Sequence, residues 1–484
     1  MSALIWAVVV ALIFAISTWF FLNVAFKNCS LIRLIFVVAF VLHISSAFLI
    51  HYTNFYPFGG GEGDQDLYHA AAVSIARDFR EGVVTLGEIK EHLETYHGTH
   101  GYPVILGVLY AITTPERIVG MMMSAWFSAI SVILVYLIAL QISGSPKGSF
   151  FAGMAAALYP SLLYFGSLLL KDTVVVPVIL LGLLCMIKIV QRFSWKYIIL
   201  FVFVLLPALQ FRFYMAVALL WTFSLSWPFL MGIDWRKKIR YGIFVLIPIG
   251  FIPQMFGYGY YASGVILQYT NPEKIELYRE HVYTRQILEP DKNDESSDPS
   301  PVSPVSPISP KEPESPVLIK TEEPSVEPSS PSIVSPPRKG GGPGSTVIVE
   351  TGDTAVSFIL NYLLSFSFVS LGPFPWHMRY ARQYLALLET IPWCVIFFFI
   401  VWGTIRERRR WRVFLPVILF DVGLFSMLAL LLASNFGVYM RIRMPAFLVL
   451  LTLLAFPFAK ISLTQLYENT RNWGGRIYRI LPRR

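Results

Sequence analysis

The stretch GGGEGDQDLYHAAA, residues 59 to 72, places three carboxylates beside a row of glycines, directly after a long apolar segment. Asp64 and Asp66 could bind a divalent cation as an Asp-x-Asp pair, because hard cations take oxygen ligands. The glycines could cradle phosphate, but no strand precedes them. One aspartate could act as a general base on an acceptor hydroxyl while nearby cations stabilise an anionic leaving group. A plain N-cap role for Asp64 is a fourth alternative.

The cations that the general-base alternative requires lie at the ends of short apolar runs. Fifteen residues separate Asp172 from Lys188, and sixteen separate Arg443 from Lys460. As helices such runs span about 22 to 24 Å, less than the ~30 Å hydrocarbon core, so their outer ends lie below the surface. The charged residues placed there are Lys171, Asp172, Arg212, Arg441 and Arg443. Buried charges of this kind predict a recessed site for an anionic ligand. Snorkelling together with a pair between Asp172 and Lys171 or Arg212 is the structural alternative.

Composition identifies the setting as a membrane. The 484 residues are 55% hydrophobic and only 14% charged, and several uncharged runs reach bilayer-crossing length. The net charge of +9 comes from basic residues concentrated in short gaps between these runs, which follows the positive-inside rule and argues against nucleic acid as the partner. The sequence therefore predicts an all-α polytopic membrane protein with about eleven spans (nine to thirteen), the N-terminus outside and the C-terminus inside.

The predicted spans are 3–23, 34–51, 118–141, 148–165, 173–188, 197–211, 213–233, 241–256, 383–405, 413–433 and 444–460. The apolar piece 102–112 reaches only ~17 Å and is expected to be a re-entrant or interfacial helix on the outer side. After Asp66, apolar residues recur every four positions from Leu67 to Phe79, which predicts an amphipathic helix along the outer membrane surface. Glu389 and Asp421, inside apolar runs, are expected to form structural contacts between helices.

Four regions follow from these patterns. Residues 1–288 form an N-terminal transmembrane region with an acidic first outer loop at 52–101, and 345–461 form a C-terminal transmembrane region. The Pro/Ser-rich segment 289–344 has little apolar surface to bury and is predicted to be a disordered outer insertion. Residues 462–484 are predicted to be a basic cytoplasmic tail on anionic lipids.

A family resemblance rests on motifs that occur in order along the chain. They are GDQDLYHAAAVSIA at 63–76, GYPVILGVLYAI at 101–112, ALYPSLLYFGSLLLKDT at 157–173, LGPFPWH at 371–377 and NFGVYMRIRMP at 435–445. Together they resemble the GT-C integral-membrane glycosyltransferases of the protein O-mannosyltransferase and aminoarabinose-transferase type. The resemblance covers most of the chain outside the Pro/Ser-rich segment. The sequence departs from the family at Lys171-Asp172, where many members carry a glutamate, and the paired acidic residues of the mannosyltransferases are not reproduced.

The resemblance implies an inverting enzyme that transfers a sugar from a polyprenyl-phosphate carrier to a glycan, lipid or protein acceptor. The active site would lie on the outer face of a plasma membrane of bacterial type. Asp64 would be the base, with Asp66 as second choice, and the carrier phosphate would be held by Lys171, Arg212, Arg441 and Arg443. Asp172 and His377 are assigned to the same substrate site, His377 through hydrogen bonds to sugar hydroxyls. No cofactor is expected, although a divalent metal on the aspartates and the HGTH stretch at 97–100 is an alternative.

Two other functions remain open at this stage. An O-antigen ligase or polymerase also combines many spans with phosphate-binding arginines, but its essential cations would lie in the large late loop. A transporter or flippase for lipid-linked oligosaccharides would need polar residues along a path open to both faces. The deep charges of this sequence instead gather at outer helix ends, which favours the glycosyltransferase.

Overall fold

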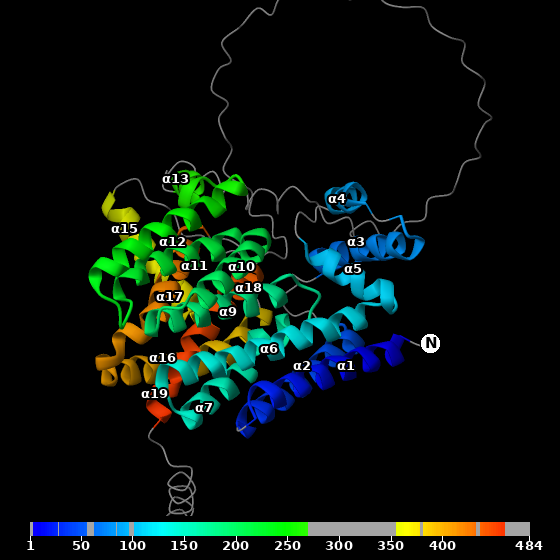
Figure 1. The fold of residues 1–484 in the computed structure, drawn as a ribbon. Helices are drawn as coiled ribbons and strands as arrows, with labels where there is room; N and C mark the ends of the chain where they lie inside the picture. The colour runs from blue at the N-terminus through cyan, green and yellow to red at the C-terminus, as the bar shows by residue number, and fades with distance from the viewer. Residues whose placement is uncertain are drawn as a thin grey trace, which may run out of the picture. The chain divides into compact units, whose positions relative to one another are not determined.

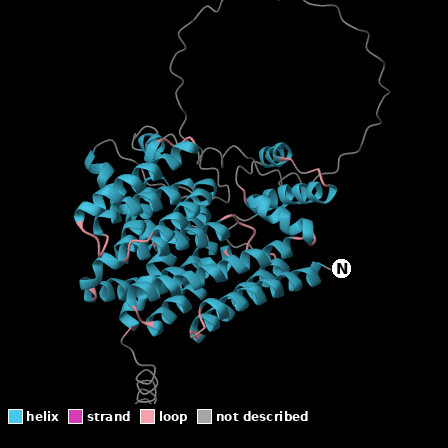
Figure 2. Cartoon of the chain, viewed as in Figure 1, coloured by secondary structure: helices cyan, strands magenta, loops and turns pink. Residues whose placement is uncertain are grey.

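The computed structural model is helical in every element that it describes (Figure 2). It describes residues 3–27, 29–55, 62–83, 85–95, 101–269, 355–377, 381–431 and 436–459. The predicted disordered insertion at 289–344 and the predicted basic tail at 462–484 lie outside these ranges. The all-α fold class predicted from the sequence is confirmed for the described part of the chain.

Helices that are long and apolar enough to cross a membrane number seven in the described ranges, so the chain is an integral membrane protein. They include α1 (Ala3–Ala25), α2 (Ser30–Thr53), α6 (Arg117–Ser143), α9 (Asp172–Gln191), α16 (Leu387–Arg406), α17 (Trp411–Leu431) and α18 (Phe436–Leu451), the last continued by η6 (Thr452–Leu454) and α19 (Ala455–Phe458). An eighth span results if α12 (Trp235–Met255) and the segment Tyr260–Leu267, bent by 77°, cross together. The predicted number of about eleven is not confirmed.

The other predicted spans form helices too short to pass as spans by length. The run 148–165 breaks into α7 (Pro146–Ala157) and α8 (Pro160–Phe165), because a residue before proline avoids the helical conformation and Tyr159 is extended. The runs 197–211 and 213–233 become α10 (Trp195–Phe211) and α11 (Phe213–Ser226). A further apolar helix, α15 (Ala355–Leu371), lies between the predicted spans 241–256 and 383–405. The α13 helix (Ser263–Tyr269) follows α12.

The centre of the helical bundle is formed by α6 and α9, which pack against each other and are mostly buried. Helix α6 also packs against α1, α2 and α7 (Figure 1). Helix α1 is apolar all round yet mostly exposed, as expected of a helix that faces lipid. The bundle thus places α9 among several neighbouring helices.

The first loop folds into three helices: α3 (Glu62–Glu81), α4 (Leu86–Thr95) and α5 (Tyr102–Ile112). Helix α5 matches the predicted short helix and packs against α3. The Arg80 guanidinium on α3 donates to the carbonyl oxygens of Tyr110, Ala111 and Thr113 at 2.6, 3.1 and 3.0 Å. Carbonyls at the C-terminal end of a helix lack the usual partner four residues on, so Arg80 supplies hydrogen bonds there and fixes α3 on α5.

The buried face of α3 differs from the predicted stripe. Ala71 and Ile75 are buried as predicted, but Leu67 and Phe79 are each 37% exposed. Residues spaced by four advance 40° around a helix at each step, so a stripe of that spacing leaves the face at both ends. The positions that complete the buried face are Tyr68, Ala72 and Ala76. The prediction of an amphipathic helix is confirmed, with its face rotated.

A glycine sets the distance between α3 and α5. A Cβ atom at Gly107 would stand 2.7 Å from Ile75 Cγ2 and 3.2 Å from the carbonyl oxygen of Ala72. We predict that Gly107→Ala lowers the free energy of unfolding by about 1–3 kcal/mol, because the two helices must separate. Chemical denaturation in detergent measures the effect. Gly87→Ala is the matched control, since a Cβ there meets only Thr85 Oγ1 at 3.6 Å, and an equal loss in both variants would contradict the prediction.

Candidate functional site

Asp172 is a buried carboxylate shared by two arginines at the N-terminal end of α9. It is 1% exposed. Arg212 donates from Nε to Oδ1 at 2.9 Å and from Nη2 to Oδ2 at 3.0 Å. Arg441 Nε lies 3.0 Å from Oδ2, in ion-pair contact but without the alignment of a hydrogen bond. The pair with Arg212 is the one that the structural alternative predicts, whereas the second arginine extends it into a cluster.

Asp64 joins this cluster through Arg441. The Nη1 atom of Arg441 donates to Asp64 Oδ2 at 2.7 Å, across 377 positions of sequence. The Asp64 side chain is 41% exposed, while that of Arg441 is 9% exposed. Arg441 therefore bridges two carboxylates, with Asp172 on its buried side and Asp64 on its accessible side. The structure brings together Asp64, Asp172, Arg212 and Arg441 from four separate parts of the chain.

Lys171 precedes Asp172 and adds a third cation. Its side chain is buried, and its pKa is lowered to about 7, by burial first and then by the charge of Arg212. Asp172 opposes this shift by favouring the charged ammonium. The cluster thus holds two permanent cations, two carboxylates and one amine whose charge changes near neutral pH. With Lys171 protonated, the side chains sum to one positive charge.

Each charge is positioned by a break or an end in a helix. Asp172 is the first residue of α9, and Arg212 is the extended residue between α10 and α11. Arg441 lies on α18, which packs against α9, and Asp64 is the third residue of α3. Asp64 is therefore inside the first helical turn, and the N-cap alternative is wrong. The argument from short apolar runs correctly places charged residues at these ends.

Asp66 faces away from the cluster. Its carboxylate pairs with Arg117 at the start of α6, and both side chains are about half exposed. Residues two apart on a helix lie 200° apart around the axis, so Asp64 and Asp66 cannot turn the same way. In this arrangement the Asp-x-Asp stretch does not form one cation site. The second choice for the base becomes part of a surface ion pair.

Arg443 is the predicted phosphate ligand that the structure places elsewhere. It is 0% exposed, and its Nη2 donates to Glu389 Oε1 at 2.8 Å. Its Nη1 donates to the carbonyl oxygen of Gly372, and its guanidinium lies 4.5 Å from the centre of the Phe447 ring. Like the aspartates of α3, Arg441 and Arg443 are two residues apart on a helix and point to opposite sides. In this structure Arg443 is not among the residues paired in the cluster, because the buried Glu389 carboxylate already compensates its charge.

The Glu389 network is structural, as predicted. Besides Arg443, the carboxylate accepts hydrogen bonds from Tyr159 Oη at 3.0 Å and from the backbone amide of Ser161 at 3.1 Å. It also accepts one from Ser161 Oγ. The network ties α16, α8 and α18 together beneath the site. Asp421, the other acidic residue in an apolar run, is buried, and neither of its carboxylate oxygens has a hydrogen-bond partner among the described residues, so its predicted contact between helices is not found there.

The remaining predicted residues lie outside the described parts. The side chain of His377 is not described, and residues 97–100 with the HGTH stretch also lie outside. Sequence analysis missed two residues of α3 that face the cluster. Burial raises the pKa of the Tyr68 hydroxyl, and the charges of Asp64 and Asp172 raise it further. Gln65 is buried and accepts a hydrogen bond from the amide of Leu169 at 3.3 Å. Tyr68 is one helical turn after Asp64, and that spacing is the signal that could have identified it.

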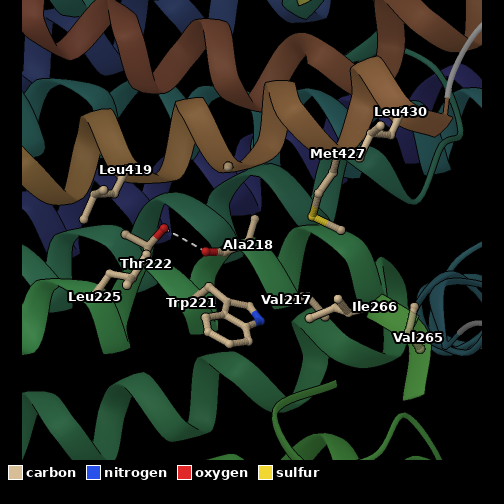
Figure 3. Close-up of a pocket in the computed structure, with 11 residues that line it drawn as sticks. Val217, Ala218, Trp221, Thr222, Leu225, Val265, Ile266, Leu419, Met427 and Leu430 are labelled. Atoms are coloured by element: carbon tan, nitrogen blue, oxygen red, sulfur yellow. Dashed lines mark hydrogen bonds between the residues drawn. The ribbon is translucent and has the colours of Figure 1, made fainter. Parts of the chain in front are cut away.

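An apolar cavity of about 290 Å³ lies among α11, α13 and α17. Figure 3 shows Trp221 of α11 and Met427 of α17 at this cavity. Val217, which also lines it, is five residues after Arg212, about 7.5 Å along the helix. The lining continues down α11 to Leu225, away from the charged cluster. The end of the cavity lining at Val217 and the Arg212 of the charged cluster thus both belong to the N-terminal part of α11.

The arrangement suits a ligand with an anionic group and an apolar chain. Buried arginines bind phosphate through bidentate hydrogen bonds, and a partly exposed carboxylate beside them can accept a proton from a bound hydroxyl. No protein-family model matches the chain, and no curated protein matches it.

The charge of Asp172 should be essential for folding. We predict that Asp172→Asn lowers the free energy of unfolding by about 3–5 kcal/mol, because it leaves Arg212 without a carboxylate and Arg441 with only that of Asp64. Asp66→Asn is the matched control and should cost less than ~1 kcal/mol, since its pair with Arg117 is exposed. Denaturation in detergent compares the two. Recovery of part of the loss by adding Arg212→Met would support the charge imbalance, and similar losses in Asp172→Asn and Asp66→Asn would contradict it.

Anion binding should depend on pH through Lys171. The amine is charged below its pKa of about 7 and neutral above it, so sulfate should bind more weakly at pH 8 than at pH 6. The expected change is about tenfold, the loss of one charge-assisted hydrogen bond of ~1.5 kcal/mol. Sulfate keeps its own charge across this range. Titration calorimetry measures the affinity for sulfate. Lys171→Met should bind sulfate weakly at both pH values, and Lys171→Arg should bind it well at both. A wild-type affinity that rises with pH would overturn the assignment.

Proposed function

We propose that the chain is a glycosyltransferase of the GT-C type, which takes its sugar from a polyprenyl-phosphate carrier. The single observation that carries the proposal is the contact of Asp64 with Arg441, 2.7 Å apart. It joins the acidic first loop to a cation of the last spanning segment, as a base and a leaving-group site must be joined. The sugar would pass to a glycan, lipid or protein acceptor on the outer face.

In the proposed reaction, the acceptor hydroxyl attacks the anomeric carbon of the sugar. The bond between that carbon and the phosphate oxygen breaks with inversion, while the new bond to the acceptor oxygen forms. The proton of the acceptor moves to Asp64, and the carrier leaves as a phosphate with one additional negative charge. Asp64 suits the base role because its side chain is 41% exposed, so an acceptor reaches the carboxylate from the solvent side.

The leaving phosphate would be held by Arg441, Arg212 and Lys171. These cations are already arranged around Asp172, so they need little reorganisation when negative charge develops. Asp64 occupies one side of Arg441 in this structure. We propose that the carrier phosphate takes this place on Arg441 and leaves the Asp64 carboxylate to accept the proton. Arg443 has no part in this scheme, since Glu389 already pairs with it.

The carrier chain would lie in the groove lined by α11 and α17. This groove starts about one and a half turns from Arg212 and is lined almost entirely by apolar side chains. A phosphate at the cluster and an isoprenoid chain in the groove would need no rearrangement of α11. The ligase alternative puts its cations in the late loop, whereas the cations of this cluster lie at helix ends. The charges also gather at one end of α9, which disfavours a transport path.

The base assignment predicts a clear difference between two neighbouring aspartates. Asp64→Asn should lower the rate of sugar transfer by about 10²–10⁴-fold, because the amide cannot accept the proton. Asp66→Asn, which only breaks the surface pair with Arg117, should keep the wild-type rate within a few-fold. The assay uses the purified full chain with polyprenyl-phosphate sugars and extracts of the membrane as acceptor source.

Folding must be checked alongside activity. Both variants should elute as folded protein and unfold at temperatures near that of the wild type. Unchanged transfer by folded Asp64→Asn would remove Asp64 from the base role. Loss of transfer in Asp66→Asn alone would move that role to the second aspartate.

A further inference from the structure

A second cavity, of about 460 Å³, lies between α1, α6 and α9, away from the charged cluster. Its wall is mostly apolar and includes Leu22 of α1 and Phe26 just after it, Leu134 and Leu137 of α6, and Leu181 and Leu184 of α9. The groove extends along α6 from Trp126 to Leu137, about 16 Å as a helix. That length matches one leaflet of a ~30 Å hydrocarbon core.

One end of this groove is closed. The indole of Trp126 stacks on Phe14, with ring centres 4.5 Å apart, and its Nε1 donates to Thr18 Oγ1 at 2.8 Å. Trp126 and Thr18 both line the cavity. The closed end is therefore held by a fixed aromatic contact between α1 and α6.

The other end changes from apolar to polar within one helical turn. Gln141 follows Leu137 by four residues, and Lys188 follows Leu184 by four, so each continues the face of its helix that lines the groove. These two side chains meet: Lys188 Nζ donates to Gln141 Oε1 at 3.0 Å. Gln191, one turn further, hydrogen-bonds both to the Gln141 side chain and, at 2.9 Å, to its carbonyl oxygen. A cation and two amides thus form the open end of the groove.

Lys188 lacks a counter-charge in the described part of the chain. It contacts the neutral amide of Gln141 and the ring of Tyr197, whose centre lies 5.5 Å from Nζ, and no carboxylate of the described residues lies within ion-pair distance. Lys27, which directly follows Phe26, adds an exposed cation at the same end of α1. A half-buried cation beside an apolar groove is complementary to an anionic amphiphile.

We propose that this groove binds one anionic phospholipid, with its phosphate on Lys188 and the two glutamines and one acyl chain in the groove. The positive-inside rule makes this leaflet the cytoplasmic one. Asp172 and Lys188 lie sixteen residues apart on α9, about 24 Å. The lipid site is therefore separate from the charged cluster and does not depend on the proposed glycosyltransferase activity.

The test uses the fluorescence of Trp126, which lies at the closed end. The full chain is reconstituted in phosphatidylcholine bilayers that contain a small fraction of phosphatidylglycerol with bromine near the end of its acyl chains. The difference between wild type and Trp126→Phe isolates the signal of Trp126. Brominated phosphatidylglycerol should quench this signal at mole fractions about tenfold lower than brominated phosphatidylcholine does, since the headgroup gains a charge-assisted contact.

Variants then assign the headgroup site. Lys188→Gln should remove the preference for phosphatidylglycerol, whereas Lys196→Gln, an exposed lysine at the start of α10, should keep it. Equal quenching by both lipids in the wild type would overturn the proposal, as would quenching that does not depend on Trp126. Soluble glycerol phosphate should not reduce the quenching by brominated phosphatidylglycerol. If it did, the site would bind the headgroup alone, and the proposed acyl-chain groove would be wrong. If Lys188→Gln fails to fold, the two-lipid comparison on the wild type still decides.

Discussion

The ion pairs of the Asp172 carboxylate are the interaction on which the arrangement at the N-terminal end of α9 depends. Two largely buried arginines are stable only if a negative charge compensates them, because burying unpaired charge is costly. Asp172 contacts Arg212 and Arg441 together, so it holds the end of α10, the start of α11 and helix α18 around the first residue of α9. The same contact leaves one side of Arg441 directed to Asp64, which connects the folded first loop to the bundle.

Helical periodicity decides which charges meet. Asp64 and Asp66 on α3, and Arg441 and Arg443 on α18, are both pairs separated by two positions, and in each pair one member enters the cluster while the other makes an ion pair elsewhere. The ion pair of Arg443 with Glu389 fixes α18 from the opposite side. Arg441 is thus positioned by a buried network that it does not touch. This division gives each charge one role, either to hold the helices or to meet a ligand.

The lengths of the apolar runs predicted part of this site, and the rest could not be predicted from them. The shortness of the apolar runs was enough to place Lys171, Asp172, Arg212 and Arg441 at recessed ends. It could not separate Arg441 from Arg443, because run length carries no information on which way a helix face turns. The break at Tyr159 and the rotated face of α3 were missed for a related reason. An apolar run or a spacing of four shows which residues are apolar, but not where the helix breaks or which way its face turns. The predicted number of spans counted the runs that form α10 and α11, and the structure shows that both helices are too short to pass as spans by length.

The charges at the two ends of α9 differ in how they are compensated. At one end three cations gather around two carboxylates, and at the other a single lysine lies at the mouth of an apolar groove. The central claim concerns the first end, where Asp64 and Arg441 are proposed as base and phosphate ligand of one site. A cryo-EM structure of the full chain with a bound polyprenyl-phosphate sugar tests it most directly. The account predicts the phosphate on Arg441, Arg212 and Lys171, with the Asp64 carboxylate released from Arg441 and facing the anomeric carbon; a phosphate bound away from Arg441, with the Asp64 to Arg441 pair intact, would contradict it.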